Sequence, residues 1–252
     1  MYLKAGDIQQ LLNSLHFLHY PYFVILTKLI RYRDKIKRLS QMRPGNFNEY
    51  KDMVDVTALS DFCRDNGKLC HYAKGEAMVQ QGSVGKYFGV VESGYFKYTT
   101  ITTDGAEAVV GFAFEGECVC DFNNSFRGLP SEVAIVAGCE TDVWQVNFKA
   151  IIDIIENRLN GLHDSIADAL FREIYHRHLD IYRKSPTERY LELLSNHPEI
   201  FDIVTMREVA SYLLVTPVYL SRIRKNSLKN PANKTCFIPK SLFLPNFANQ
   251  IY

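Results

Sequence analysis

The spacing of apolar residues changes twice along the chain. From Met53 to Asn66, and again from Phe148 onward, apolar side chains recur every three or four positions, which is the period of an amphipathic helix. Between these stretches the pattern shortens to alternating or β-branched runs separated by glycines, with a Thr-Asp-Gly-Ala tetrapeptide at 103–106 that is typical of a hairpin turn. Short strands at near-regular spacing predict an antiparallel, jelly-roll-like β-roll, so we expect an α+β fold.

A long helix is expected from Leu162 to Lys184. Its apolar stripe has spacings of four, four, four and three and consists of Ile166, Leu170, Ile174, His178 and Ile181. Such a stripe suits a two-stranded seam with a second copy of the chain. The alternative is that this face packs on the chain's own sheet. Within a seam, His178 is better explained as a polar seam residue than as a metal ligand.

A small helical domain follows this helix. It begins with Ser185-Pro186-Thr187-Glu188, a capping box with proline at the first helical position. Its last part, TMREVASYLLVTPVYLSRIRK at 205–225, predicts two short helices joined by a tight turn. Thr205 and Glu208 form a second capping box, and Thr216 caps the second helix. The inward positions are Val209, Ala210, Leu213, Leu220 and Ile223.

The outward face of that second helix suits the DNA major groove. Its residues, together with the cap, are Thr216, Val218, Tyr219, Ser221, Arg222, Arg224 and Lys225. The alternative is a helical hairpin with a solvated face that docks a protein partner. Charge favours DNA, because the segment from Val209 to Tyr252 contains no Asp or Glu and carries +6.

The small net charge of the chain conceals an asymmetric distribution. The total of +1 results from +6 in residues 1–44, −11 in residues 45–208 and +6 in residues 209–252. An acidic body with basic ends indicates that contact with nucleic acid is confined to the ends. The six cysteines include no Cys-x-x-Cys pair and are too few for a disulfide framework, which favours a reduced, cytoplasmic protein.

Residues 11–30, LLNSLHFLHYPYFVILTKLI, form the most apolar stretch and are followed by basic residues. A membrane anchor is disfavoured, because the stretch contains several polar residues, Pro21 and Lys28, and no small-residue cleavage site follows it. We expect no membrane partner here, but an amphipathic helix broken at Pro21. Alternatively, the natural chain begins at Met42.

The order of these parts resembles the Crp/Fnr family of bacterial transcription regulators. The resemblance rests on GSVGKYFGVVESGYFKYTTITTDGAEAVVGF at 82–112 and on the two-helix motif at 205–225, and it covers about residues 54–225. SPTERYLELL and TPVYLSRIRK look like a branch common in Bacteroidetes-type bacteria. The implied organisation is an N-terminal extension (1–52), a cyclic-nucleotide-binding-like roll (53–160), a dimerisation helix (161–184), a helix-turn-helix domain (185–229) and a basic tail (230–252).

The resemblance also implies partners and roles. It implies a homodimer on double-stranded DNA, with RNA polymerase and an unknown small effector as further candidate partners. Arg222 lies where the family places an arginine that reads a base edge, which physically suits guanine O6 and N7. Arg224 and Lys225 are better placed for phosphates. Two departures are notable: Pro217 and Val218 replace residues that are often Arg and Glu, and Leu214 replaces a turn glycine, where a positive φ would strain it.

For the effector pocket, the resemblance places Cys120 and Asp121 at a Gly-Glu pair and Ser131 and Glu132 at the Arg-Ser pair that neutralises a cyclic phosphate. Asp121 retains the ability to accept from a sugar hydroxyl. Without the arginine, and with Glu132 added, a phosphate would meet repulsion, so we expect no response to cAMP. The alternatives are an unknown small effector and a filled core without a ligand.

The sequence predicts no cofactor and no enzyme. Cys63 and Cys70 are too far apart to resemble an iron–sulfur ligand run, and no Ser/His/Asp set, Cys/His set or P-loop is present. Cys118 and Cys120 share a strand face, where plain core cysteines are commoner than a metal or redox pair. No other histidine is near His71 in the sequence. A jelly-roll metalloenzyme is a third class of function, and elemental analysis of the purified protein would detect its metal.

Overall fold

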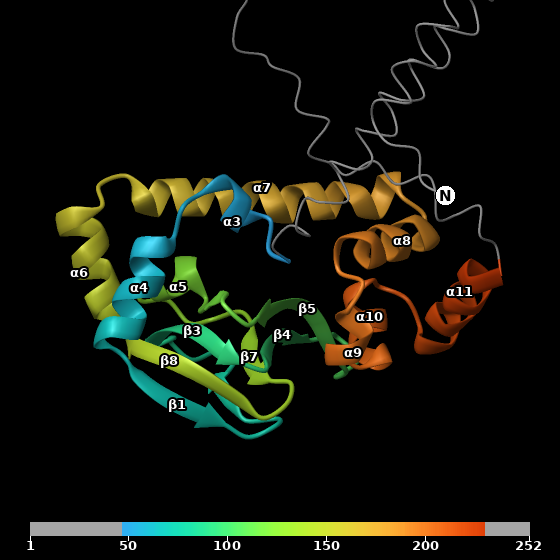
Figure 1. Cartoon of the computed structure of the whole chain (residues 1–252), viewed down its shortest axis with the longest axis horizontal. Coiled ribbons are helices and arrows are strands. Elements are labelled where there is room, and N and C mark those ends of the chain that lie inside the picture. Colours follow the sequence, from blue (N-terminus) through green and yellow to red (C-terminus); the bar gives the residue numbers. More distant parts are fainter. Residues whose placement is uncertain (1–46, 230–252) are drawn as a thin grey trace, which may run out of the picture. The chain divides into compact units, whose positions relative to one another are not determined.

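The computed structural model describes residues 47–229 (Figure 1). The predictions for the N-terminal extension and for the basic tail therefore lie almost wholly outside the described residues. None of the helices within residues 47–229 has the length and hydropathy needed to span a bilayer.

Two four-stranded antiparallel sheets form the centre of the fold, as predicted from the glycine-separated runs. One sheet has the order β1-β8-β3-β6 and the other the order β2-β7-β4-β5. Their bounds are β1 Lys68–Tyr72, β2 Ala77–Val79, β3 Tyr87–Ser93, β4 Tyr95–Ile101, β5 Glu107–Phe114, β6 Cys118–Val119, β7 Ala134–Ala137 and β8 Thr141–Asn147. Alternate strand positions face inward and form the core of the roll. This core contains Val91, Phe96, Ile135 and Val143, each of which is 0% exposed.

The predicted hairpin turn connects β4 to β5. The backbone N–H of Thr102 donates to the carbonyl of Ala106 at 2.9 Å, and the N–H of Gly105 donates to the carbonyl of Thr102 at 2.9 Å. Gly105 has φ of 83°, a conformation that glycine adopts without steric cost. This confirms the turn that the sequence predicts at 103–106.

The helices precede, interrupt and follow the roll (Figure 1). Their bounds are α3 Tyr50–Met53, α4 Thr57–Asn66, α5 Phe122–Phe126, α6 Phe148–Arg158, α7 Leu162–Arg183, α8 Pro186–Asn196, α9 Ile200–Ile203, α10 Met206–Tyr212 and α11 Pro217–Lys229. The helix expected to begin at Met53 begins instead at Thr57, after the short α3. The capping box at Ser185 and Glu188 forms as predicted at the start of α8.

The predicted stripe on α7 does not face one environment. Ile166 is buried and packs with the roll and α6 in one core cluster, and Leu170 packs against the same cluster. Ile174, in contrast, is 56% exposed. The alternative that the helix packs on its own domain is therefore correct for the first part of α7. The exposed apolar strip of α7 consists of Phe171, Ile174, Tyr175, Ile181 and Tyr182. Its three aromatic members are absent from the predicted stripe.

Candidate functional site

The turn between α10 and α11 fixes the relative direction of the two helices. Thr205 and Glu208 form the predicted capping box, in which the Thr205 Oγ1 accepts from the Glu208 N–H at 3.3 Å. At the other end of α10, the Val215 N–H donates to the Ala210 carbonyl and the Leu214 N–H donates to the Ser211 carbonyl, each at 2.9 Å. This is a Schellman motif, whose left-handed position usually holds glycine. Here Leu214 occupies this position with φ of 57°. The turn therefore keeps the shape it has with glycine, and Leu214 carries the steric strain of a left-handed conformation.

Helix α11 has one buried and one exposed face, as its spacing predicts. The Thr216 hydroxyl caps it by accepting from the Tyr219 N–H at 3.2 Å. Leu220 is 0% exposed, whereas Val218 on the opposite face is 63% exposed. The other outward positions named from the sequence are exposed together with Val218: Thr216, Tyr219, Ser221, Arg222, Arg224 and Lys225. Their role in DNA binding stays a prediction.

The basic side chains of α11 differ in what they contact. The guanidinium of Arg224 stacks over the ring of Phe201, with 4.8 Å between the guanidinium carbon and the ring centroid. This cation–π contact, which the sequence spacing does not reveal, orients Arg224 before any ligand arrives. Within residues 47–229, neither Arg222 nor Lys225 makes an ion pair. Their charges are therefore free to meet a polyanion.

The two-helix motif is held against the roll through α10. The Glu208 carboxylate accepts from the Tyr95 hydroxyl at 3.0 Å and pairs with the Lys97 ammonium at 3.4 Å. The Val109 N–H donates to the Ser211 hydroxyl at 2.9 Å. Burial alone would raise the pKa of Glu208, but the bonds from Thr205 and Tyr95 and the nearby Lys97 together hold that pKa below its ordinary value. Glu208 thus caps α10 and fixes it to β4.

Tyr212, at the end of α10, is the second point of attachment. Its ring centroid lies 5.6 Å from that of Phe47 and 5.5 Å from that of Phe112, which belongs to β5. The Arg177 guanidinium of α7 lies 5.3 Å from the same ring and donates to the Tyr212 hydroxyl at 3.3 Å. Buried residues of β4, β5 and α8–α11 consequently form one core cluster. The small helical domain inferred from the sequence shares its core with the roll.

A cavity of about 260 Å³, slightly smaller than the usual range for small-molecule sites, lies between the roll and α7. Its apolar lining includes Val56, Leu59, Phe88, Val110, Phe112, Phe122, Val133, Ile166, Leu170 and Ile174. Its polar lining includes Asn48, Tyr50, Tyr98, Cys118, Cys120, Asp121, Asn123, Glu173 and Arg177. The lining residues come from positions far apart in the sequence, so the cavity exists only in the folded chain.

Two of the four predicted effector residues line this cavity and two do not. Cys120 and Asp121 are part of its wall, whereas Ser131 and Glu132 are not. Ser131 is buried and donates to the Asp121 carboxylate at 2.7 Å, and Glu132 is exposed. The Asn124 amide donates to the same carboxylate oxygen at 2.9 Å. The contact between Ser131 and Asp121 is internal to the wall, and a role of the four residues in effector binding stays a prediction.

Glu173 and Arg177 of α7 are cavity residues that sequence reasoning missed. They are four positions apart, so the sequence indicates that they share one face of the helix. It does not indicate that this face is turned toward the cavity. Burial raises the pKa of Glu173 to about 7, against the opposing effects of the Tyr50 N–H bond and the Arg177 charge. Burial also raises the pKa of the Cys118 and Cys120 thiols, which keeps them protonated and unreactive.

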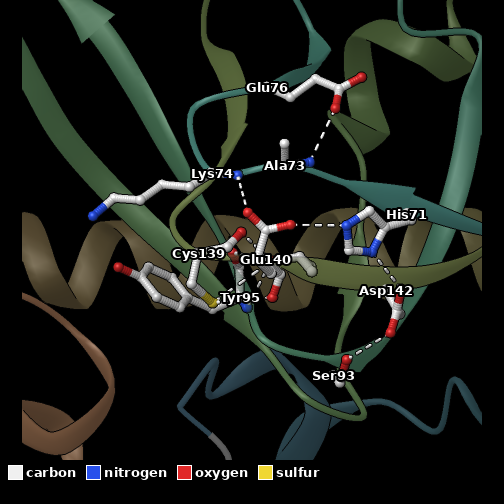
Figure 2. Close-up of polar contacts among 10 residues, drawn as sticks. His71, Ala73, Lys74, Glu76, Ser93, Tyr95, Cys139, Glu140 and Asp142 are labelled. Atoms are coloured by element: carbon white, nitrogen blue, oxygen red, sulfur yellow. Dashed lines mark hydrogen bonds and ion pairs between the residues drawn. The ribbon is translucent and has the colours of Figure 1, made fainter.

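His71 is not isolated in the structure. Figure 2 shows its imidazole between two carboxylates, with Nδ1 2.9 Å from Asp142 and Nε2 2.8 Å from Glu140. Asp142 is its cross-strand partner on β8, which explains why the sequence spacing alone missed the contact. The hydrogen bonds to Asp142 and Glu140 raise the pKa of His71. Within the described residues, no group of three or more His, Cys, Asp or Glu side chains is arranged to hold a metal ion.

Comparison with known proteins identifies the fold to which this chain is similar. Residues 69–158 match the family model of the cyclic nucleotide-binding domain. FixK2 from Bradyrhizobium japonicum is similar in structure, with 17% sequence identity over 65% of this chain and 85% of that chain and a TM-score of 0.54. No curated protein matches the chain.

Two further solved structures agree. A proposed cAMP-binding regulatory protein from Silicibacter pomeroyi DSS-3 is 18% identical over 73% of this chain and 86% of that chain, with a TM-score of 0.52. A CooA mutant from Carboxydothermus hydrogenoformans is 14% identical over 75% of this chain and 88% of that chain, with a TM-score of 0.50. At these identities the likeness shows the fold. Residues 69–158 thus match a cyclic nucleotide-binding domain, in a chain with the fold of Crp/Fnr-type regulators.

Proposed function

We propose that the chain is a sequence-specific, DNA-binding transcription regulator of the Crp/Fnr type. The single observation that supports this most is α11, which buries Leu220 and exposes Arg222 and Lys225, neither of which forms an ion pair within residues 47–229. An exposed helix face with unpaired cations suits the negatively charged major groove. The acid-free sequence around it adds to the same expectation. Under this proposal the chain is a regulator and not an enzyme, it acts in the cytoplasm, and RNA polymerase is a further partner.

The proposal includes a homodimer joined through α7. Phe171, Tyr175, His178 and Tyr182 recur at intervals of four, three and four, which is the spacing of a two-stranded seam. Tyr182 is 77% exposed, which leaves a large apolar surface for a partner helix. Two-fold symmetry would present two copies of α11 to two half-sites of DNA. Sedimentation that finds only monomer at all concentrations contradicts this part of the proposal.

The proposal also holds that cAMP is not the effector. A cyclic phosphate needs positive charge on the roll side of the cavity, and Asp121 lies there instead. Ser131 donates to that carboxylate, so its hydroxyl is already used. Arg177 is the one cationic residue of the cavity lining within the described residues, and it belongs to α7 rather than to the segment between β6 and β7.

The experiment that tests DNA recognition uses Arg222→Ala. Genomic fragments bound by the purified full chain first define the cognate site. The variant is expected to bind that site about 5- to 150-fold more weakly, since one bidentate base contact contributes roughly 1–3 kcal/mol, and to bind random duplex almost unchanged. Fluorescence anisotropy with both duplexes measures the difference. An equal loss on both duplexes would assign Arg222 to phosphate contact.

A matched control is Lys225→Ala on the same face. A phosphate contact is sequence-independent, so this variant should weaken binding to both duplexes alike. It should also reduce the slope of the logarithm of the binding constant against the logarithm of salt concentration by about one.

The rival function is a roll whose helical domain docks a protein partner. That rival predicts no steep loss of duplex binding as salt increases, and observing a flat salt dependence in the full chain would favour it.

A further inference from the structure

The cavity has chemically different ends, which follow the course of α7. Ile166, Leu170, Glu173 and Arg177 all line it from one face of this helix. At a rise of 1.5 Å per residue, Ile166 and Arg177 are about 16 Å apart along the axis. The first end is apolar, because Ile166 clusters there with Phe88 and Phe122. The second end carries the charged groups, so an occupant that fits both ends is amphipathic.

Arg177 has unused hydrogen-bonding capacity at the charged end. Its guanidinium is mostly buried and carries five N–H donors, yet within residues 47–229 the Tyr212 hydroxyl is its one hydrogen-bond acceptor. Glu173 and Glu49 are the acids whose charges act on it. Glu173 accepts instead from the Tyr50 N–H at 2.9 Å, which directs that carboxylate to the backbone of α3.

Asp121, the other acidic residue of the lining, is already hydrogen-bonded within the protein. The Asp121 carboxylate accepts from Ser131 and Asn124 through one oxygen, which ties it to the wall of the roll. Burial also favours the neutral form of Glu173, whose pKa is raised to about 7. A cationic ligand would therefore meet one tethered and one partly protonated acid, whereas an anionic group would meet a guanidinium with free donors.

We propose that the cavity binds a small monocarboxylate with an apolar alkyl or aryl body, whose carboxylate pairs with Arg177 and whose body lies against Ile166 and Leu170. The planar guanidinium matches a carboxylate with two parallel hydrogen bonds, which a neutral amide does not reproduce. The apolar wall supplies the rest of the binding by excluding water from the alkyl or aryl body.

The same guanidinium connects the cavity to the two-helix motif. It lies over the Tyr212 ring, and Phe112, another cavity residue, contacts that ring from β5. A carboxylate on Arg177 neutralises the charge that attracts the ring and competes for the donor to the Tyr212 hydroxyl. Ligand binding is therefore expected to loosen the end of α10 from α7. This second half of the inference rests on the proposed DNA-binding function, whereas carboxylate binding does not.

The test uses the full chain without DNA and two acid–amide pairs as probes: octanoate with octanamide, and 3-phenylpropanoate with 3-phenylpropanamide. Isothermal titration calorimetry is expected to give at least about tenfold tighter binding of an acid than of its amide. cAMP serves as a third probe and is expected not to bind. Equal binding of acid and amide, or no binding of either acid at millimolar concentration, overturns the proposal.

Two variants assign the preference to Arg177. Arg177→Gln should abolish the acid preference, and Arg177→Lys, which keeps the charge but not the planar fork, should retain only part of it. Arg172→Gln, at an exposed position of the same helix outside the cavity lining, is the matched control and should leave the preference intact. Thermal unfolding of each variant verifies folding, and the wild-type acid–amide comparison does not depend on any variant. An acid preference that survives Arg177→Gln overturns the assignment.

Hydrogen exchange tests the coupling separately. Octanoate is expected to increase amide exchange in residues 206–212 of the wild type by about fivefold or more, and to change Tyr212→Phe less because that variant already lacks the hydroxyl. Unchanged exchange in the wild type at saturating octanoate overturns the coupling while leaving the binding result standing. A failure of DNA binding alone would affect neither measurement.

Discussion

The outward face of α11 and the cavity beside α7 are the two candidate binding surfaces, and they differ in how their polar groups are used. On α11 the cations Arg222 and Lys225 are exposed and make no ion pair within the described residues. In the cavity, Asp121 and Glu173 are already hydrogen-bonded to the protein. The difference teaches that an exposed binding face depends on local spacing, whereas a buried one depends on which polar groups the fold leaves unsatisfied.

The largest expected effect tests whether α11 has two independent faces. Leu220→Ala removes a fully buried side chain from the shared core and should lower the free energy of unfolding by about 3 kcal/mol. Chemical denaturation followed by circular dichroism measures it. The matched control is Val218→Ala on the exposed face, expected to change stability by less than about 0.5 kcal/mol. Similar losses for both variants would mean that the outward face is packed as well.

The next effect tests whether charge in the cavity reduces stability. Burial raises the pKa of Glu173 to about 7, so the folded state binds a proton that the unfolded state releases near pH 4.5. The favourable contribution is fully present below pH 4.5 and is lost as pH rises through 7. Glu173→Gln should therefore be more stable than the wild type at pH 8, by roughly 2–3 kcal/mol, and nearly equal to it at pH 4.5.

Denaturation at both pH values measures this difference. Glu156→Gln, on the exposed side of α6, is the matched control and should show no such pH-dependent gain. If Glu173→Gln is less stable than the wild type at pH 8, the ionised carboxylate stabilises the folded state despite its burial. The contrast between the two surfaces would then be weaker.

The smallest effect tests the strained turn that leads into α11. Leu214 is mostly exposed and holds φ of 57°, which costs a side-chain-bearing residue about 1 kcal/mol. Leu214→Gly should raise the melting temperature, with a net gain of about 0.5–1 kcal/mol after the entropy that glycine adds to the unfolded chain. Arg207→Gly, at an exposed position of α10, is the control and should lower stability by about 1 kcal/mol.

The sequence by itself determined those features that depend on neighbouring residues. The capping boxes at Ser185 and Thr205, the hairpin turn at 103–106 and the two faces of α11 follow from local hydrogen bonds and from the helical period. The left-handed conformation of Leu214 was expected only from the family resemblance, which places a turn glycine at that position. The alternating strands were sufficient to predict the roll.

Only the tertiary structure decided what depends on contacts between distant residues. It buried Ile166 but left Ile174 exposed on the same predicted stripe, because the roll covers only the first turns of α7. It brought Arg177 to Tyr212, which is 35 positions away, and His71 to Asp142, which is 71 positions away. The physical reason is that helical and strand periods state which residues share a face, whereas the partner of that face is chosen by packing over the whole chain.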